Sequence, residues 1–98
     1  MDSYSSKREV EKVKPATLLV AADVSLALHE IGQEVMRARQ KFRPFNSAHE
    51  GYAVLLEEVE ELWQEVKRKQ SSRDLERMQA EAVQIAAMAI RFLTDVQR

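Results

Sequence analysis

The chain has 98 residues, a net charge of −1 and no cysteine. A chain of this length forms one domain and buries only a modest core by itself, so we expect it to form oligomers. The balanced charge argues against nucleic-acid binding, which needs a basic surface. The lack of cysteine excludes disulfides, zinc–thiolate sites and thiol catalysis.

The composition predicts an all-α fold. Ala, Leu, Glu, Gln, Arg, Lys and Met dominate, only two glycines and two prolines occur, and no strand-like alternation is visible. No apolar run reaches the roughly 18 residues of a membrane span, and the N-terminus does not resemble a signal peptide. We therefore expect a cytoplasmic protein with no membrane partner. Its fold should be a bundle of three to four helices, completed by homo-oligomerisation.

The N-terminal part divides into a tail and a helical region. Residues 1–14 are polar and mixed in charge, which predicts a mobile tail, and residues 15–98 should form the single domain. Pro15 suits the first turn of a helix. The pattern is helical from about residue 17 to residue 40, as either one helix or two. Its apolar stripe consists of Val24, Leu28, Ile31 and Val35.

A loop around Pro44 should end this region, because the residue before a proline disfavours helix. The two phenylalanines beside it, Phe42 and Phe45, suggest that the loop packs back onto the core. Ser47 and Glu50 then form a capping box, which predicts a helix running to about Lys69. Its apolar stripe consists of Leu55, Leu56, Val59, Leu62, Trp63 and Val66, so Trp63 is expected in the core, with base stacking as the alternative.

A turn at residues 70–72 separates this helix from a final one, expected from about Arg73 to Val96. Ser71 and Asp74 have the spacing of a second N-terminal cap. Arg91 is placed opposite the apolar stripe, where it could reach a phosphate, another subunit or neither. That stripe consists of Leu75, Met78, Ala82, Ile85, Ala86, Ala89, Leu93 and Val96.

The second helix also carries an acidic flank. Five glutamates lie between residues 55 and 66, and Glu58, Glu61 and Glu65 fall together roughly 100–160° from the centre of the apolar stripe. Glutamates on a helix are usually a solvated face, so spacing alone favours that interpretation. The alternative is a metal site.

The short turn predicts an antiparallel hairpin, and the hairpin sets a register between the two helices. Glu61 and Glu81 are equally far from Ser71, and so are Glu58 and Gln84, so each pair should lie at one level. Crowded carboxylates raise one another's pKa unless a cation neutralises them. Oxygen ligands without His or Cys suit Mg²⁺ or Mn²⁺.

Two half-motifs in this hairpin resemble those of the MazG-like all-α nucleotide pyrophosphohydrolases. The family signature is E-E-x-x-E, a spacer, and then E-x-x-D. Here Glu57-Glu58-x-x-Glu61 matches the first half, and Glu81-x-x-Gln84 matches the second except that Gln84 replaces the aspartate. The resemblance covers about residues 24–96 and includes the context Ala86-Ala87-Met88-Ala89-x-Arg91-Phe92.

The resemblance implies hydrolysis of a nucleoside triphosphate to its monophosphate and pyrophosphate, by a homodimer or homotetramer that uses Mg²⁺ or Mn²⁺. It implies that Glu57 supports a second ion or orients the attacking water. It raises the prospect that Arg91 contacts a phosphate. Apart from the resemblance, Tyr52 and Phe42 could line a base pocket, with Trp63 as a further candidate. The metal ligands by position would be Glu58, Glu61, Glu81 and, as a neutral amide, Gln84.

The glutamine at position 84 keeps a second possibility open. A neutral amide should bind the cation more weakly than a carboxylate does. The change could mark a subgroup with different substrates, a weak activity or a lost one. The alternative function is therefore a non-catalytic helical oligomerisation or binding module that retains the MazG-like scaffold.

Overall fold

A computed structural model describes residues 15–97 of the chain, with side chains described from residue 22 onward. Within that range the chain is all-helical and contains no strand, which confirms the predicted fold class. The mobile tail predicted for residues 1–14 lies outside the described residues. The elements are α2 (Pro15–Lys41), α3 (Ala48–Val66), the short 3₁₀ helix η1 (Gln70–Ser72) and α4 (Leu75–Asp95).

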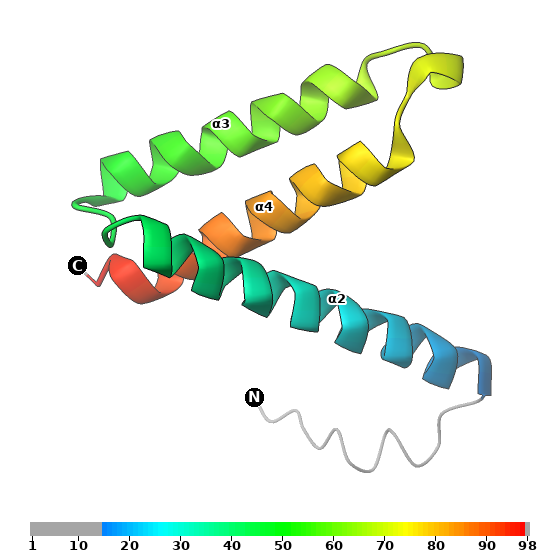
Figure 1. Cartoon of the computed structure of the whole chain (residues 1–98), viewed down its shortest axis with the longest axis horizontal. Helices are drawn as coiled ribbons and strands as arrows, with labels where there is room; N and C mark the ends of the chain where they lie inside the picture. Colours follow the sequence, from blue (N-terminus) through cyan, green and yellow to red (C-terminus); the bar gives the residue numbers. More distant parts are fainter. Residues whose placement is uncertain (1–14, 98) are drawn as a thin grey trace.

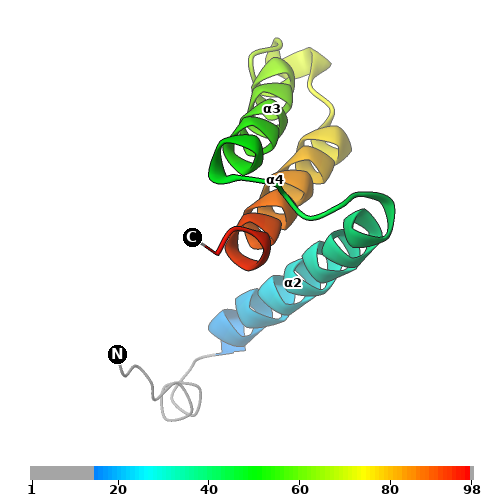
Figure 2. The same ribbon diagram turned by 90° about the vertical axis from the view of Figure 1, so that its left-hand side faces the viewer.

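Helix α4 is the centre of the arrangement. Figure 1 shows α3 and α4 as an antiparallel pair joined through η1, with α2 on the other side of α4. Figure 2 shows the same order from the side. Helix α4 therefore packs against two neighbours, whereas α2 and α3 each pack against one. Nothing in the described range, from residue 15 to residue 97, is a helix long and apolar enough to cross a membrane.

Helix α2 is continuous, which settles whether this region is one helix or two. Pro15 is its first residue, where the missing amide hydrogen has no intrahelical partner to lose. The helix ends at Lys41, before the Arg43–Pro44 pair whose ring disfavours further helix.

Helix α3 begins directly after the predicted N-cap, Ser47. The Ser47 hydroxyl accepts a hydrogen bond from the backbone N–H of Glu50 at 3.1 Å. The Glu50 carboxylate accepts one from the backbone N–H of Asn46 at 2.5 Å. The first bond satisfies an amide group that the first turn leaves without a helical partner. The second bonds the residue before the N-cap, one position earlier than the backbone N–H that a full capping box would use. The helix ends at Val66, one turn short of the predicted Lys69.

The predicted cap at Ser71 is wrong. Ser71 lies within η1, and α4 begins only at Leu75, capped by the Asp74 carboxylate, which accepts from the backbone N–H of Arg77 at 3.1 Å. Arg73 is extended here and donates from Nε to the Val66 carbonyl at 2.8 Å. The side chain of Arg73 therefore caps the end of α3, while its backbone lies before the start of α4.

The buried core lies where α2, the α2–α3 loop and α4 meet. Phe45 is buried there, which confirms that the loop packs back onto the core, whereas Phe42 remains exposed. Gly51 on α3 is also buried, and a Cβ at this position would lie 2.7 Å from the Phe92 ring and 3.1 Å from the Phe45 ring. Glycine thus permits the close approach of α3 to the Phe45 and Phe92 rings. The buried apolar residues are Val35, Ala38, Phe45, Ala87 and Met88.

The predicted apolar stripe of α3 is split in two by the structure. Leu55, Leu62 and Val66 are half-buried. The other side of the stripe is open, because α3 packs only against α4. Trp63 is 55% exposed, so its predicted place in the core is wrong within a single chain. With it, the exposed apolar residues on α3 are Tyr52, Leu56 and Val59.

The stripes predicted for α4 and α2 are also partly wrong. Leu75 and Leu93 of α4 are exposed, whereas Met88 and Arg91 are buried, because contact with two helices buries more than one stripe. On α2 the C-terminal part of the stripe is covered. The N-terminal part is not, and both Val24 and Leu28 are more than half exposed. A cavity of about 550 Å³ separates this part of α2 from α4.

Candidate metal centre

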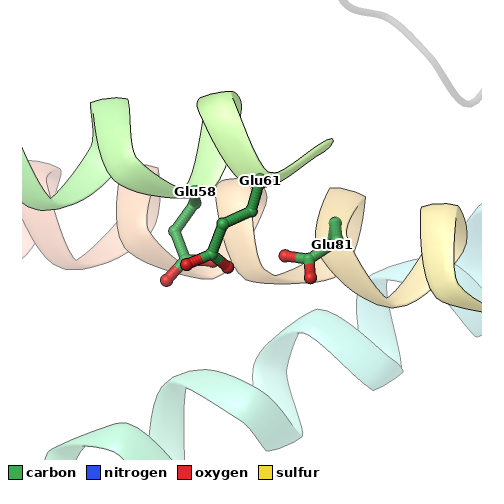
Figure 3. Close-up of side chains that lie close together, drawn as sticks. All are labelled: Glu58, Glu61 and Glu81. Atoms are coloured by element: carbon green, nitrogen blue, oxygen red, sulfur yellow. The ribbon is translucent and has the colours of Figure 1, made fainter. Parts of the chain in front are cut away.

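Three carboxylates converge on the α3–α4 pair. Glu58 and Glu61 lie one turn apart on α3, and Glu81 faces them from α4 (Figure 3). One carboxylate oxygen from each residue lies within 4.8 Å of the others. The shared level predicted for Glu61 and Glu81 from the hairpin register is thus confirmed.

The side chains of this group repel one another. The pKa of the Glu58 carboxyl is raised by partial burial and then by the negative charges of Glu61, Glu81 and Glu57. The pKa of the Glu81 carboxyl is raised by burial and then by Glu61, while Arg77 opposes the shift. The arrangement therefore favours a proton or a cation among these oxygens.

The donor set fits a hard divalent cation. Mg²⁺ takes oxygen ligands at 2.0–2.1 Å, so two of its ligands lie at most about 4.2 Å apart. Oxygens already within 4.8 Å reach that separation by small side-chain rotations. Three carboxylates also leave coordination positions for water or phosphate, as Mg²⁺ sites with few protein ligands do.

Gln84 does not belong to the three-carboxylate group but lies next to it. It is half-buried and lines a cavity together with Glu57 and Glu58. Gln84 is one turn after Glu81 on α4, and it shares the cavity wall with Glu58, the residue predicted to lie at its level.

The cavity has a volume of about 460 Å³, in the range of small-molecule sites. Its walls come from all three long helices and from the α2–α3 loop. The periodicity of the sequence does not predict that α2 contributes to this wall. That contribution depends on how α2 packs against α4, which residues far apart in the sequence determine. The lining residues that carry polar or aromatic groups are Glu34, Phe42, Arg43, Phe45, Asn46, Glu50, Glu57, Glu58, Gln84 and Arg91.

The structure does not bring Tyr52 and Trp63 to this cavity. Both are exposed on the outward side of α3. The aromatic residues in the cavity wall are Phe42 and Phe45, on either side of Pro44. A proline between two phenylalanines directly before a capping box was the sequence signal for this wall.

Arg91 is buried, so its predicted position opposite the packed face of the last helix is wrong. Its guanidinium carbon lies 4.3 Å from the centre of the Phe45 ring, in a cation–π contact. Its Nη2 donates to the carbonyl of Arg43 at 2.9 Å, and its Nε lies 3.7 Å from the Asp95 carboxylate. The loop that packs over α4 covers this side chain.

Glu65, the third member of the predicted acidic flank, has a different environment. It is buried and forms ion pairs with Arg77 at 3.4 Å and with Arg68 at 3.6 Å. Of the three glutamates in the acidic flank, Glu65 is thus neutralised by arginines near the turn. Glu58 and Glu61 instead lie close to Glu81.

Comparison with protein-family models, with curated proteins and with solved structures finds no match to this chain.

Proposed function

We propose that this protein is a MazG-like hydrolase that converts a nucleoside triphosphate to its monophosphate and pyrophosphate in the cytoplasm, using Mg²⁺ or Mn²⁺. One observation carries the proposal: the convergence of Glu58, Glu61 and Glu81 beside a cavity of nucleotide size. Between residues 22 and 97, none of these three carboxylates has an ion-pair partner within 4 Å. Uncompensated charge beside a cavity is typical of functional sites.

Each acidic residue has a role in this proposal. Glu58, Glu61 and Glu81 would hold the cation. When bound, the cation would neutralise charge on the triphosphate and lower the pKa of the attacking water. Glu57 lines the cavity beside Glu58, and its carboxylate would orient that water and accept its proton. A bond would form between the water oxygen and the α-phosphorus, the bond from that phosphorus to the α–β bridging oxygen would break, and pyrophosphate would leave with that oxygen.

The same proposal includes assembly into a homodimer or homotetramer. Tyr52, Leu56, Val59 and Trp63 form an exposed apolar surface on α3, and α2 exposes Val24 and Leu28. Apolar surfaces of this kind on a small domain are expected to be covered by a partner, and symmetric homo-oligomers are the commonest solution.

The test is pyrophosphate release from a panel of standard and modified nucleoside triphosphates, with Mg²⁺ or Mn²⁺. The wild-type chain is measured beside Glu58→Ala. We expect metal-dependent turnover that falls at least about 10³-fold in the variant, since the lost carboxylate is a ligand to the catalytic cation. Absence of metal-dependent turnover on every substrate, or turnover that the substitution leaves unchanged, would contradict the proposal.

A second candidate is a non-catalytic oligomerisation or binding module on the same scaffold. The exposed apolar residues of α2 and α3 favour it, because they need a partner whether or not the site is active. Light scattering after gel filtration measures the assembly. A stable oligomer without turnover on any substrate would favour this second candidate.

A further inference from the structure

We infer that Arg43 is the residue of the cavity that contacts the polyphosphate, and that buried Arg91 and Asp95 hold its loop in position. The inference rests on the proposed function and deepens it, because it assigns the substrate phosphate to a different arginine from the one suggested by the sequence. Two arginines line the cavity, Arg43 and Arg91, and their surroundings differ.

The Arg91 guanidinium is already engaged by the protein. Its side chain is 5% exposed, stacks over Phe45, donates to the Arg43 carbonyl and lies beside Asp95. A guanidinium in this arrangement would have to break contacts with the loop in order to bind a phosphate. Its geometry suits a structural role, in which it fixes the loop.

Asp95 completes the attachment of the loop. Its carboxylate accepts from the backbone N–H of Phe45 at 3.2 Å and forms an ion pair with Arg39 of α2 at 3.1 Å. Arg91 and Asp95 thus hold the backbone on both sides of Pro44, whose ring restricts that backbone further. A loop fixed before the ligand arrives loses less conformational entropy on binding.

Arg43 itself is exposed and lines the same cavity as Glu58. In the part of the chain with described side chains, its guanidinium forms no ion pair within 4 Å. Its backbone carbonyl accepts a hydrogen bond from Arg91. The guanidinium is therefore available to a ligand, and its planar donors match phosphate oxygens in a bidentate contact.

Like the two arginines, the glutamates that line the cavity differ in whether other groups of the protein already bind them. Glu34 forms an ion pair with Arg37, and Glu50 accepts from the backbone N–H of Asn46. Glu57 and Glu58 have no ion pair among the described side chains. A polyphosphate could enter this acidic cavity only with cationic partners, and Arg43 supplies one that is independent of the bound metal.

The test measures binding rather than turnover. Calorimetric titration with inorganic tripolyphosphate, and with an α,β-imido nucleoside triphosphate that resists cleavage, is carried out in the presence of Mn²⁺. We expect Arg43→Ala to weaken binding of both about tenfold, which is one charge-assisted contact, and Arg43→Lys to weaken it less. The matched control is Arg68→Ala, which removes the same charge from the exposed end of α3 and should bind like wild type.

Thermal unfolding separates a lost contact from a disturbed loop, and Arg43→Ala should melt at the wild-type temperature. Wild-type affinity in Arg43→Ala, an equal loss in Arg68→Ala, or no tripolyphosphate binding by the wild-type chain would each overturn the inference. Parallel hydrolysis assays separate it from the proposed function. Arg43-dependent binding without turnover supports the inference alone, whereas turnover with unchanged binding and KM in Arg43→Ala supports the proposed function alone.

Discussion

The α3–α4 pair carries two groups of glutamate that lie close together and are treated differently by the fold. Glu65 is buried and paired with Arg68 and Arg77. One turn earlier on α3, Glu61 faces other carboxylates and has no such partner among the described residues. The α3–α4 hairpin thus neutralises Glu65 with two arginines of the protein, whereas no described arginine or lysine forms an ion pair with Glu61.

Arg77 lies near both groups of glutamates, so the different charge environments of Glu65 and Glu81 are not explained by the lack of a nearby positively charged side chain. It forms an ion pair with Glu65 and also opposes the rise in the pKa of Glu81, yet burial and Glu61 outweigh it. A glutamate paired with arginine is a structural feature. Where carboxylates still repel one another beside an arginine, binding of a divalent cation relieves that repulsion.

Substitutions in the two groups of glutamates should affect activity very differently. Glu61→Gln and Glu81→Gln each keep the shape of the side chain but remove a charged ligand, so we expect kcat/KM to fall about 10³-fold. Glu65→Gln should leave kcat/KM within about threefold and lower the free energy of unfolding by about 1 kcal/mol, because its arginine partners are exposed. Steady-state kinetics and urea unfolding measure the two effects.

An equal loss of activity in all three of these variants would mean that the two groups of glutamates do not differ in function.

Cation binding gives the next largest effect, and it does not depend on turnover. Mn²⁺ at a hundredfold excess over its Kd should stabilise the wild-type chain by about 2.7 kcal/mol. For a domain of this size that is a rise in Tm of roughly 10 °C or more. Glu58→Gln should lose the rise and Glu65→Gln should keep it. The same rise in both variants would place the cation elsewhere.

Gln84→Asp adds a fourth carboxylate next to Glu58, Glu61 and Glu81. More ligand charge raises cation affinity, so we expect Mn²⁺ to bind about tenfold more tightly by calorimetry. Without a cation, the added repulsion should lower the Tm. Unchanged affinity would show that residue 84 is not a ligand.

The smallest effect is the pH dependence of stability in the presence of a chelator. The pKa values of Glu58 and Glu81 are raised in the folded state, so folding takes up protons between the ordinary value of 4.5 and the raised values. The contribution of these groups to stability is therefore fully present below pH 4.5 and is lost as the pH rises through that window.

Urea unfolding at a series of pH values checks this dependence. The double variant Glu58→Gln with Glu81→Gln should flatten this part of the profile, and added Mn²⁺ should flatten it too. A profile that neither change affects would contradict the repulsion inferred for the group.

Helix boundaries and turns that depend on the spacing of neighbouring residues could be predicted from the sequence. The capping box at Ser47, the break at Pro44 and the turn at residues 70–72 are set by the chemistry of neighbouring residues. The level of Glu61 against Glu81 also follows, since a short turn and a fixed helical rise leave little freedom in an antiparallel hairpin.

Which residues α2 and the α2–α3 loop cover could not be predicted from the sequence, because it depends on how the helices pack in three dimensions. The burial of Arg91, the exposure of Trp63 and the cavity beside Glu58 all depend on where α2 crosses the hairpin. A periodic stripe shows which face of a helix can be buried, but it does not show how many neighbours that helix will have. Because α4 has two neighbours and α3 only one, α4 buries residues beyond its predicted stripe, such as Arg91, whereas α3 leaves part of its stripe exposed, including Trp63.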